Sequence, residues 1–393
     1  MQLRQPLGAL GRRRGCCARR YATQPPKAAA PERGRAPQLY RHQRAVIFPG
    51  QGAQFVGMGK DLYEQFPAAR EVFEETDEAL GLGLSRLVLG GDPKDLVLTE
   101  NAQPAIVAVS VAALRALESA TGLAASDMFS FAMGHSVGEY SALIAAQAVS
   151  LADGIRLVRT RGEAMQAAVK GRDYAMSACI LRTANIADVV ADVERVQRAI
   201  ADECAAATST GDAAVEPDGT NCGVVQVANI NSSSQIVLSG TRAAVDRALA
   251  SLQLKRLAAR AVNLPVSAPF HCRLMRPAKA ALEARIRELA PIRDRSAWSM
   301  PVISNVTARP HGSAGEAQQH LIEQVDSPVL WLQSMQYLKE IHGISRWGAM
   351  GPGSVVGNLA GKEYAVDIVR RLSDVAAIRE FAAVLARQAQ RGY

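Results

Sequence analysis

The sequence lacks the features that mark zinc-binding, disulfide-stabilised and membrane-spanning proteins. Its six cysteines are scattered over 393 residues, with no CxxC pair and no Cys/His spacing that suits a metal. We therefore expect no metal site and no disulfide framework, but reduced cysteines in the core or in loops. No run of about 18 apolar residues could span a membrane, and no apolar segment near the N-terminus is typical of a secretion signal.

Acidic residues are almost absent from one part of the chain, its first 43 residues. There, nine arginines and Lys27 stand against the single acid Glu32, a balance of +9, whereas the whole chain carries +8. The remaining residues therefore carry −1, and the positive charge belongs to the leader. Because residues 44–393 have no excess of positive charge, the chain gives no reason to expect nucleic acid or a membrane as a partner.

The leader itself resembles a mitochondrial transit peptide. Residues 1–21 are rich in arginine and free of acids, and cleavage after Tyr21 would remove them. Residues 22–43 contain four prolines and are predicted to form a linker. We therefore expect the mature protein in the mitochondrial matrix, with a disordered basic tail as the alternative interpretation of the leader.

Apolar runs that alternate with amphipathic helical patterns predict an α/β protein. The runs 45–48 and 128–133 end at glycine or Pro-Gly, and each precedes a helical pattern, as in a parallel sheet covered by helices on both faces. We predict a hydrolase-like parallel-sheet core formed by residues 44–172 and 266–393. An inserted ferredoxin-like α+β subdomain is predicted for residues 173–265.

The prediction for the insertion follows from the order of its elements, which is βαββαβ. The expected strands are 174–182, 223–229, 235–239 and 258–264, and the expected helices are 187–206 and 241–252. Residues 205–220, rich in Ala, Thr, Gly and Asp, are predicted to form a surface loop.

The sharpest chemical signal is the pentapeptide GHSVG at residues 134–138. Between a strand and a helix, a G-x-S-x-G sequence makes a tight turn that exposes the serine hydroxyl at the helix N-terminus. Ser136 is therefore the candidate nucleophile. The amide of Val137 would point toward a developing oxyanion, at the positive end of the helix dipole. Alone, the motif also occurs in ordinary Gly/Ser turns.

A serine nucleophile needs a base, and His271 is the best placed of six histidines. By itself, a histidine after a Pro-containing turn is more often structural. The turn at residues 50–52 (GQG) matches neither a dinucleotide-binding pattern nor a P-loop, so it does not predict nucleotide binding. Beside a nucleophile, such a turn can donate a backbone amide to an oxyanion.

Six motifs, in order, resemble those of malonyl-CoA:acyl carrier protein transacylases. They are 48–52 (FPGQG), 101–105 (NAQPA), 134–142 (GHSVGEYSA), 159–162 (RTRG), 229–232 (NINS) and 264–271 (LPVSAPFH). The resemblance extends from about residue 45 to about residue 385. It implies an enzyme that uses malonyl-CoA and acyl carrier protein as substrates and needs no cofactor.

The resemblance also implies the roles of the central residues. Ser136 would be the nucleophile, His271 its base, and the backbone amides of Gln51 and Val137 the oxyanion hole. Arg161 would bind the free carboxylate of the malonyl group, a task that suits a planar, permanently charged guanidinium. Without the resemblance, Arg161 would be interpreted as one of several arginines on a helix surface.

Further roles follow for residues around the pocket. Gln103 would line the entrance, Asn229 and Asn231 would hold the small subdomain against the cleft, and Phe270 would narrow the pocket against branched acyl groups. Turn-forming asparagines are an equal alternative for the pair. Many relatives have glutamine where this chain has Leu330, whose backbone carbonyl would still orient the catalytic histidine while the glutamine amide would be lost.

Acyl carrier proteins are usually acidic, so we expect a basic docking patch on a monomeric enzyme. The candidates form two clusters, Lys255, Arg256 and Arg260, and Arg273, Arg276 and Lys279. Two other functions remain open. A serine esterase or thioesterase would share the nucleophile but hand the acyl group to water, and a carrier-binding protein could retain the fold without catalysis.

Overall fold

The structure is a computed structural model that describes residues 43–169, 171–182, 185–209, 222–289, 291–365 and 367–390. The predicted transit peptide at residues 1–21 and all but the last residue of the predicted linker lie outside the described residues. Of the loop predicted for residues 205–220, the first five residues belong to a helix instead, and the rest lie outside the described part.

The larger sheet has five parallel strands in the order β7-β2-β1-β8-β9. They are β1 (Arg44–Phe48), β2 (Phe131–Gly134), β7 (Val302–Ile303), β8 (Arg346–Met350) and β9 (Ile368–Leu372). Phe48 pairs with Gly134, so β1 and β2 end side by side. The predicted strand 128–133 begins too early, because residues 125–128 form the short helix α6.

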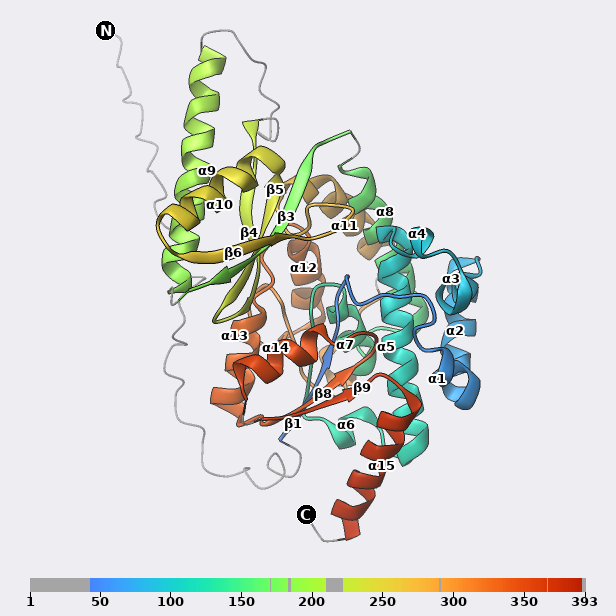
Figure 1. The fold of residues 1–393 in the computed structure, drawn as a ribbon. Helices are drawn as coiled ribbons and strands as arrows, with labels where there is room; N and C mark the ends of the chain where they lie inside the picture. The colour runs from blue at the N-terminus through green and yellow to red at the C-terminus, as the bar shows by residue number, and fades with distance from the viewer. Residues whose placement is uncertain are drawn as a thin grey trace, which may run out of the picture.

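Helices cover both faces of this sheet (Figure 1). Those before the small sheet are α1 (Lys60–Gln65), α2 (Pro67–Leu80), α3 (Leu84–Gly90), α4 (Pro93–Leu96), α5 (Thr99–Thr121), α6 (Ala125–Met128), α7 (Gly138–Ala145) and α8 (Leu151–Ala167). Those after it are α11 (Arg276–Leu289), α12 (Ala314–Gln324), α13 (Trp331–Gln336), α14 (Val355–Glu363) and α15 (Val375–Gln390).

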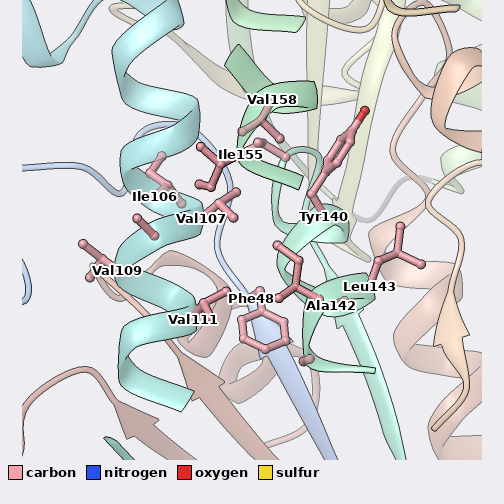
Figure 2. Packing of buried hydrophobic residues seen from close by; sticks show 14 of the residues in the cluster. Phe48, Ile106, Val107, Val109, Val111, Tyr140, Ala142, Leu143, Ile155 and Val158 are labelled. Carbon is pink, nitrogen blue, oxygen red and sulfur yellow. The ribbon is translucent and has the colours of Figure 1, made fainter. Parts of the chain in front are cut away.

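Alternate residues of β1 point to opposite faces of the sheet, as the period of a strand requires. Val46 and Phe48 pack into one apolar cluster with α5, α7 and α8, as Figure 2 shows around Phe48. Ala45 and Ile47 pack into another with α13 and α14. Among the described residues, α5 is the one helix whose length and composition would suit a membrane span, and it lies in this core.

The smaller sheet is antiparallel, with strand order β4-β5-β3-β6. Its strands are β3 (Tyr174–Leu181), β4 (Val225–Ser232), β5 (Gln235–Thr241) and β6 (Ala258–Asn263), with helices α9 (Ile186–Ser209) and α10 (Arg242–Leu254). The chain order βαββαβ and this strand order are those of a ferredoxin-like unit, and its own apolar cluster supports it. The α/β fold with a separate small sheet is therefore confirmed.

One cysteine prediction is wrong. Cys204, near the end of α9, forms a disulfide with Cys222, just before β4. The two lie 18 residues apart in a chain without other paired cysteines among the described residues, so no spacing pattern reveals the bond. Cys179 and Cys272 are free and buried, as expected.

Candidate active site

Ser136 lies in the sharp turn between β2 and α7. Its φ is +53°, in the left-handed region of backbone conformation that residues other than glycine rarely adopt. Both flanking glycines are sterically required. A Cβ at Gly134 would lie 1.9 Å from the carbonyl carbon of Gly138, and one at Gly138 would lie 2.6 Å from the carbonyl oxygen of Phe48. The GHSVG sequence thus allows β2 and α7 to meet closely enough to expose Ser136.

His271 stands opposite this serine, in the segment between β6 and α11. Its Nε2 lies 2.7 Å from Ser136 Oγ, and its Nδ1 lies 2.8 Å from the carbonyl oxygen of Gln324. A carbonyl can only accept, so Nδ1 carries the proton and Nε2 accepts the hydrogen bond from the serine hydroxyl. The structure therefore brings together the predicted pair in the tautomer that a general base requires.

Burial and, next in size, the nearby Arg161 cation lower the pKa of His271 to about 3, against the opposing hydrogen bond to Gln324. The imidazole is consequently neutral near pH 7. Removing positive charge from its surroundings would make it a stronger base.

The predicted role of Leu330 is wrong. Its carbonyl accepts a hydrogen bond from Ser334 Oγ at 2.8 Å, in the first turn of α13, and does not hold the histidine. Gln324 supplies the carbonyl instead, because it ends α12 and the last carbonyls of a helix have no partner within it. The side-chain amide that the leucine at position 330 was expected to remove from the site is also present, because Gln324 supplies it.

Arg161 projects from α8 and is 1% exposed. Its Nη1 donates to Gln103 Oε1 at 2.7 Å, and its Nη2 donates to Gln324 Oε1 at 3.0 Å and to Ser136 Oγ at 3.2 Å. Its Nε has no partner, and no carboxylate in the described part of the chain forms an ion pair with it. A buried cation without an anion beside a nucleophile is a ready site for a ligand carboxylate.

The electrostatics of Arg161 agree with this geometry. Burial lowers its pKa, whereas Tyr140 and the Glu139 carboxylate act in the opposite direction. Glu139 is fully buried, and it compensates the guanidinium charge without touching it.

The backbone amides predicted for the oxyanion hole are unengaged. Within the described residues, neither the N–H of Gln51 nor that of Val137 donates to a protein acceptor. Val137 immediately precedes α7, and a Cβ on Gly50 would lie 2.5 Å from the carbonyl oxygen of His135. The loop that carries Gln51 therefore lies against the turn, and its role as oxyanion donor stays a prediction.

The four residues predicted to line the pocket have different positions and contacts in the structure. Gln103 is fully buried and holds Arg161, so it does not line the entrance. Asn231 Oδ1 lies 2.9 Å from His135 Nε2, which ties β4 to the turn. Asn229 stands opposite Val329 in an isolated parallel bridge, whose hydrogen bonds are made by the backbones of Ala228 and Ile230. Phe270 is buried in the larger apolar cluster, and its part in selectivity stays a prediction.

Sequence reasoning missed three residues beneath the nucleophile. Asn305 Oδ1 accepts from the Ser136 N–H at 2.7 Å, and its Nδ2 donates to the Gly134 carbonyl at 2.7 Å. Glu139 accepts from Gln324 Nε2 at 2.6 Å and from the Asn305 N–H at 3.1 Å. Gln324 Nε2 also donates to the Ser136 carbonyl at 3.1 Å. Of the three, only Glu139 could have been found from the sequence, because it directly follows the GHSVG motif.

Comparisons with known proteins give a consistent result. A model of the acyl transferase domain matches residues 46–216. The malonyl CoA-acyl carrier protein transacylase of Bacillus subtilis (strain 168) is 39% identical over 332 residues, which cover 84% of this chain and 92% of that protein. The protein of the same name from Escherichia coli (strain K12) is 36% identical over 318 residues, covering 81% and 91%.

Solved structures are similar over nearly their whole length. The acyl-carrier-protein-S-malonyltransferase of Bartonella henselae has a TM-score of 0.75 at 37% identity, covering 87% of this chain and 99% of that one. A malonyl-transacylase in complex with its type II PKS acyl-carrier protein has a TM-score of 0.73 at 31% identity, covering 85% and 97%.

Proposed function

The chain belongs to the malonyl CoA-acyl carrier protein transacylase family, and on this basis we propose that it transfers malonyl groups from coenzyme A to acyl carrier protein. Ser136 takes the malonyl group as an ester and passes it to the phosphopantetheine thiol of the carrier, for fatty acid synthesis. The observation that carries this proposal is the buried, anion-free guanidinium of Arg161, 3.2 Å from Ser136 Oγ.

The first half-reaction loads the serine. His271 Nε2 takes the hydroxyl proton while Ser136 Oγ attacks the thioester carbonyl, whose developing oxyanion the amides of Gln51 and Val137 would stabilise. The carbon–sulfur bond breaks, the proton passes from His271 to the coenzyme A thiolate, and a malonyl-serine ester remains. Throughout, the malonyl carboxylate stays on Arg161.

The second half-reaction is the reverse with a new thiol. His271 takes the proton of the pantetheine thiol, the thiolate attacks the ester, and Ser136 recovers its proton as the malonyl thioester leaves on the carrier. Kinetics should be ping-pong. Because His271 is oriented by a backbone carbonyl and not by a carboxylate, the catalytic pair is a dyad.

Mass spectrometry of the intact protein after brief exposure to malonyl-CoA tests this function. Wild type should gain one malonyl group, Ser136→Ala none, and Arg161→Ala should load malonyl at least about 100-fold more slowly, as expected for loss of a buried charge partner. A malonyl adduct missing only from the serine variant would refute the role of Arg161. Release of malonate without carrier, at the rate of transfer, would favour a thioesterase, and failure of any adduct to form would favour a non-catalytic carrier-binding protein.

We propose docking of the acidic carrier at the first basic cluster. Arg256 and Arg260 are exposed and form no ion pair with described residues, whereas Lys255 pairs with Asp192 at 2.5 Å. In the second cluster, Lys279 already pairs with Asp326 at 2.8 Å. Reversing the charge of Arg256 and Arg260 should raise KM for the carrier about tenfold and spare KM for malonyl-CoA. Arg86→Glu, at an exposed position of α3, is the control, and equal effects on both substrates would exclude this surface.

We also propose that the enzyme works as a monomer in the mitochondrial matrix, in type II fatty acid synthesis. The Arg-rich, acid-poor residues 1–21 support this location. A fluorescent protein carrying residues 1–43 should enter mitochondria, and the same fusion with glutamine at the arginines of residues 1–21 should not. N-terminal sequencing of the mature protein would locate the cleavage site, and light scattering would give the mass in solution.

A further inference from the structure

Arg161 is held in place by neutral groups. The two side chains that accept hydrogen bonds from its guanidinium, apart from Ser136, are the glutamines 103 and 324, and both are fully buried. An amide oxygen fixes the position of a guanidinium as a carboxylate would, but it brings no negative charge. The charge of Arg161 is therefore left for something else to neutralise.

The compensating anion lies one side chain farther away. Glu139 contacts Gln324 Nε2 at 2.6 Å, while Gln324 Oε1 contacts Arg161 Nη2 at 3.0 Å. The amide of Gln324 thus stands between cation and anion, with its donor toward the carboxylate and its acceptor toward the guanidinium. This separation keeps the buried charge tolerable while no carboxylate occupies the guanidinium, whose Nε stays available.

The remaining donors have a defined geometry. Gln103 occupies Nη1, and Gln324 and Ser136 share Nη2, so Nε is the donor of Arg161 that is buried without a partner among the described residues. A carboxylate that takes the place of the Ser136 contact on Nη2 binds the Nε–Nη2 edge side-on through two parallel hydrogen bonds. A neutral acyl group would instead expel water from the cation and leave Nε unsatisfied, which is costly in a buried site.

We propose that Gln103 determines specificity: by fixing Arg161 without neutralising it, Gln103 makes acylation of Ser136 depend on a carboxylate carried by the acyl group. The proposal rests on the proposed malonyl transfer and adds the residue that keeps neutral acyl groups out. Its consequence is that a negative charge at position 103 would replace the substrate carboxylate and open the site to neutral acyl groups.

The test uses two substitutions of nearly equal size. Gln103→Glu keeps the acceptor and adds a charge, whereas Gln103→Met removes the acceptor and adds none. Single-turnover acylation of Ser136 by malonyl-CoA and by acetyl-CoA is followed by mass spectrometry of the full chain. In each case the serine proton leaves with the coenzyme A thiol as the ester forms.

Gln103→Glu should acylate with malonyl-CoA at least about 100-fold more slowly than wild type and with acetyl-CoA about tenfold faster, because its own carboxylate neutralises Arg161. Gln103→Met should slow malonyl loading about tenfold and keep the preference for malonyl over acetyl, since the charge persists. A role in positioning alone would lower both rates in both variants and invert no preference.

Three outcomes overturn the inference. The first is that Gln103→Glu loads malonyl in preference to acetyl by the wild-type ratio. The second is that the preference vanishes in Gln103→Met, which would make the hydrogen bond and not neutrality decisive. Thermal unfolding is measured for both variants, and if Gln103→Glu does not fold, Gln103→Asp supplies the charged variant in its place, because a positioning role would also leave the preference of Gln103→Met unchanged. If wild type itself shows no preference for malonyl, the proposed function fails together with the inference.

Discussion

Arg161 Nη2 lies 3.2 Å from Ser136 Oγ, so the carboxylate-binding cation and the nucleophile are direct neighbours. In a malonyl thioester, a single methylene separates the carboxylate from the reactive carbonyl. The two protein groups must then be equally close for one acyl group to engage both. Their contact sets the length of the acyl group as well as its charge.

This contact predicts discrimination by chain length. Succinyl-CoA carries the same carboxylate with one more methylene, so a succinyl group held by Arg161 would place its carbonyl beyond Ser136 Oγ. We expect kcat/KM for succinyl-CoA to be roughly 10 to 200 times lower than for malonyl-CoA, the usual value of one misplaced methylene. Competition between the two thioesters in one reaction measures the ratio directly, and a ratio near one would show that Arg161 does not fix the carboxylate.

The acid limb of the pH profile should report the charge of Arg161. The pKa of His271 is lowered to about 3, first by burial and then by Arg161, so the base is neutral in wild type at pH values well above 3. Replacing Arg161 by glutamine removes a cation and raises this pKa. With acetyl-CoA as donor, kcat/KM of Arg161→Gln should therefore begin to fall at a higher pH than that of wild type.

The control for this experiment is Arg159→Gln, on the same helix, where the arginine is paired with Glu163 and does not contact the dyad. Its profile should match wild type. Folding stability should fall on the same acid side. In the unfolded chain His271 binds its proton near its ordinary pKa of 6.5, so its contribution to folding stability is complete above pH 6.5 and is lost as the pH falls toward 3. Coincident acid limbs for wild type and Arg161→Gln would exclude the coupling.

Glu139 should matter for both stability and turnover, although it touches no substrate. It accepts from Gln324 and Asn305, which in turn hold His271, Arg161 and the turn at Ser136. In Glu139→Gln, the Arg161 charge loses its buried counter-ion. We expect a loss of about 3 kcal/mol in unfolding free energy, and kcat at least about tenfold lower.

Chemical denaturation and steady-state kinetics measure these two effects. Glu64→Gln, at an exposed position of α1, should change neither by more than about 0.5 kcal/mol. A Glu139→Gln protein with wild-type kcat would show that the turn and Gln324 keep their positions without the carboxylate.

The glycines of the turn predict a contrast between two alanine substitutions. Gly134→Ala would drive a Cβ to within 1.9 Å of the Gly138 carbonyl carbon, which only separation of β2 from α7 could relieve. We expect loss of acylation and destabilisation by more than about 4 kcal/mol. Gly90→Ala, at the end of α3 with open space around the added Cβ, should be neutral or stabilising by up to about 1 kcal/mol. Similar effects from both would contradict the steric argument.

The sequence predicted the parts of this site that are local and missed those that depend on tertiary structure. Ser136 is marked by glycines on both sides, and the α/β core by apolar runs before helices. Gln324 acts through a carbonyl that is free only because α12 ends there, and no residue type encodes that. The assignment to Leu330 failed for the same reason, since the start of α13 uses its carbonyl.

The disulfide was missed on similar grounds, and it gives the last prediction. Cys204 and Cys222 join the end of α9 to the start of β4 across 18 residues, a loop whose closure is worth about 3 kcal/mol in chain entropy. Both lie in the small subdomain, and neither contacts Ser136, His271 or Arg161. Reduction, or replacement of both by serine, should lower the unfolding free energy by up to about 3 kcal/mol and leave the rate of Ser136 acylation unchanged.

Mass mapping of the native and reduced protein identifies the bond, and the serine double variant separates its effect from that of the reductant. Because matrix thiols are kept reduced, the enzyme must work with this pair open if it resides there. A reduced protein that loads malonyl at the oxidised rate would be compatible with that location. A reduced protein that cannot be acylated would show that the active site depends on this bond, and would count against the matrix.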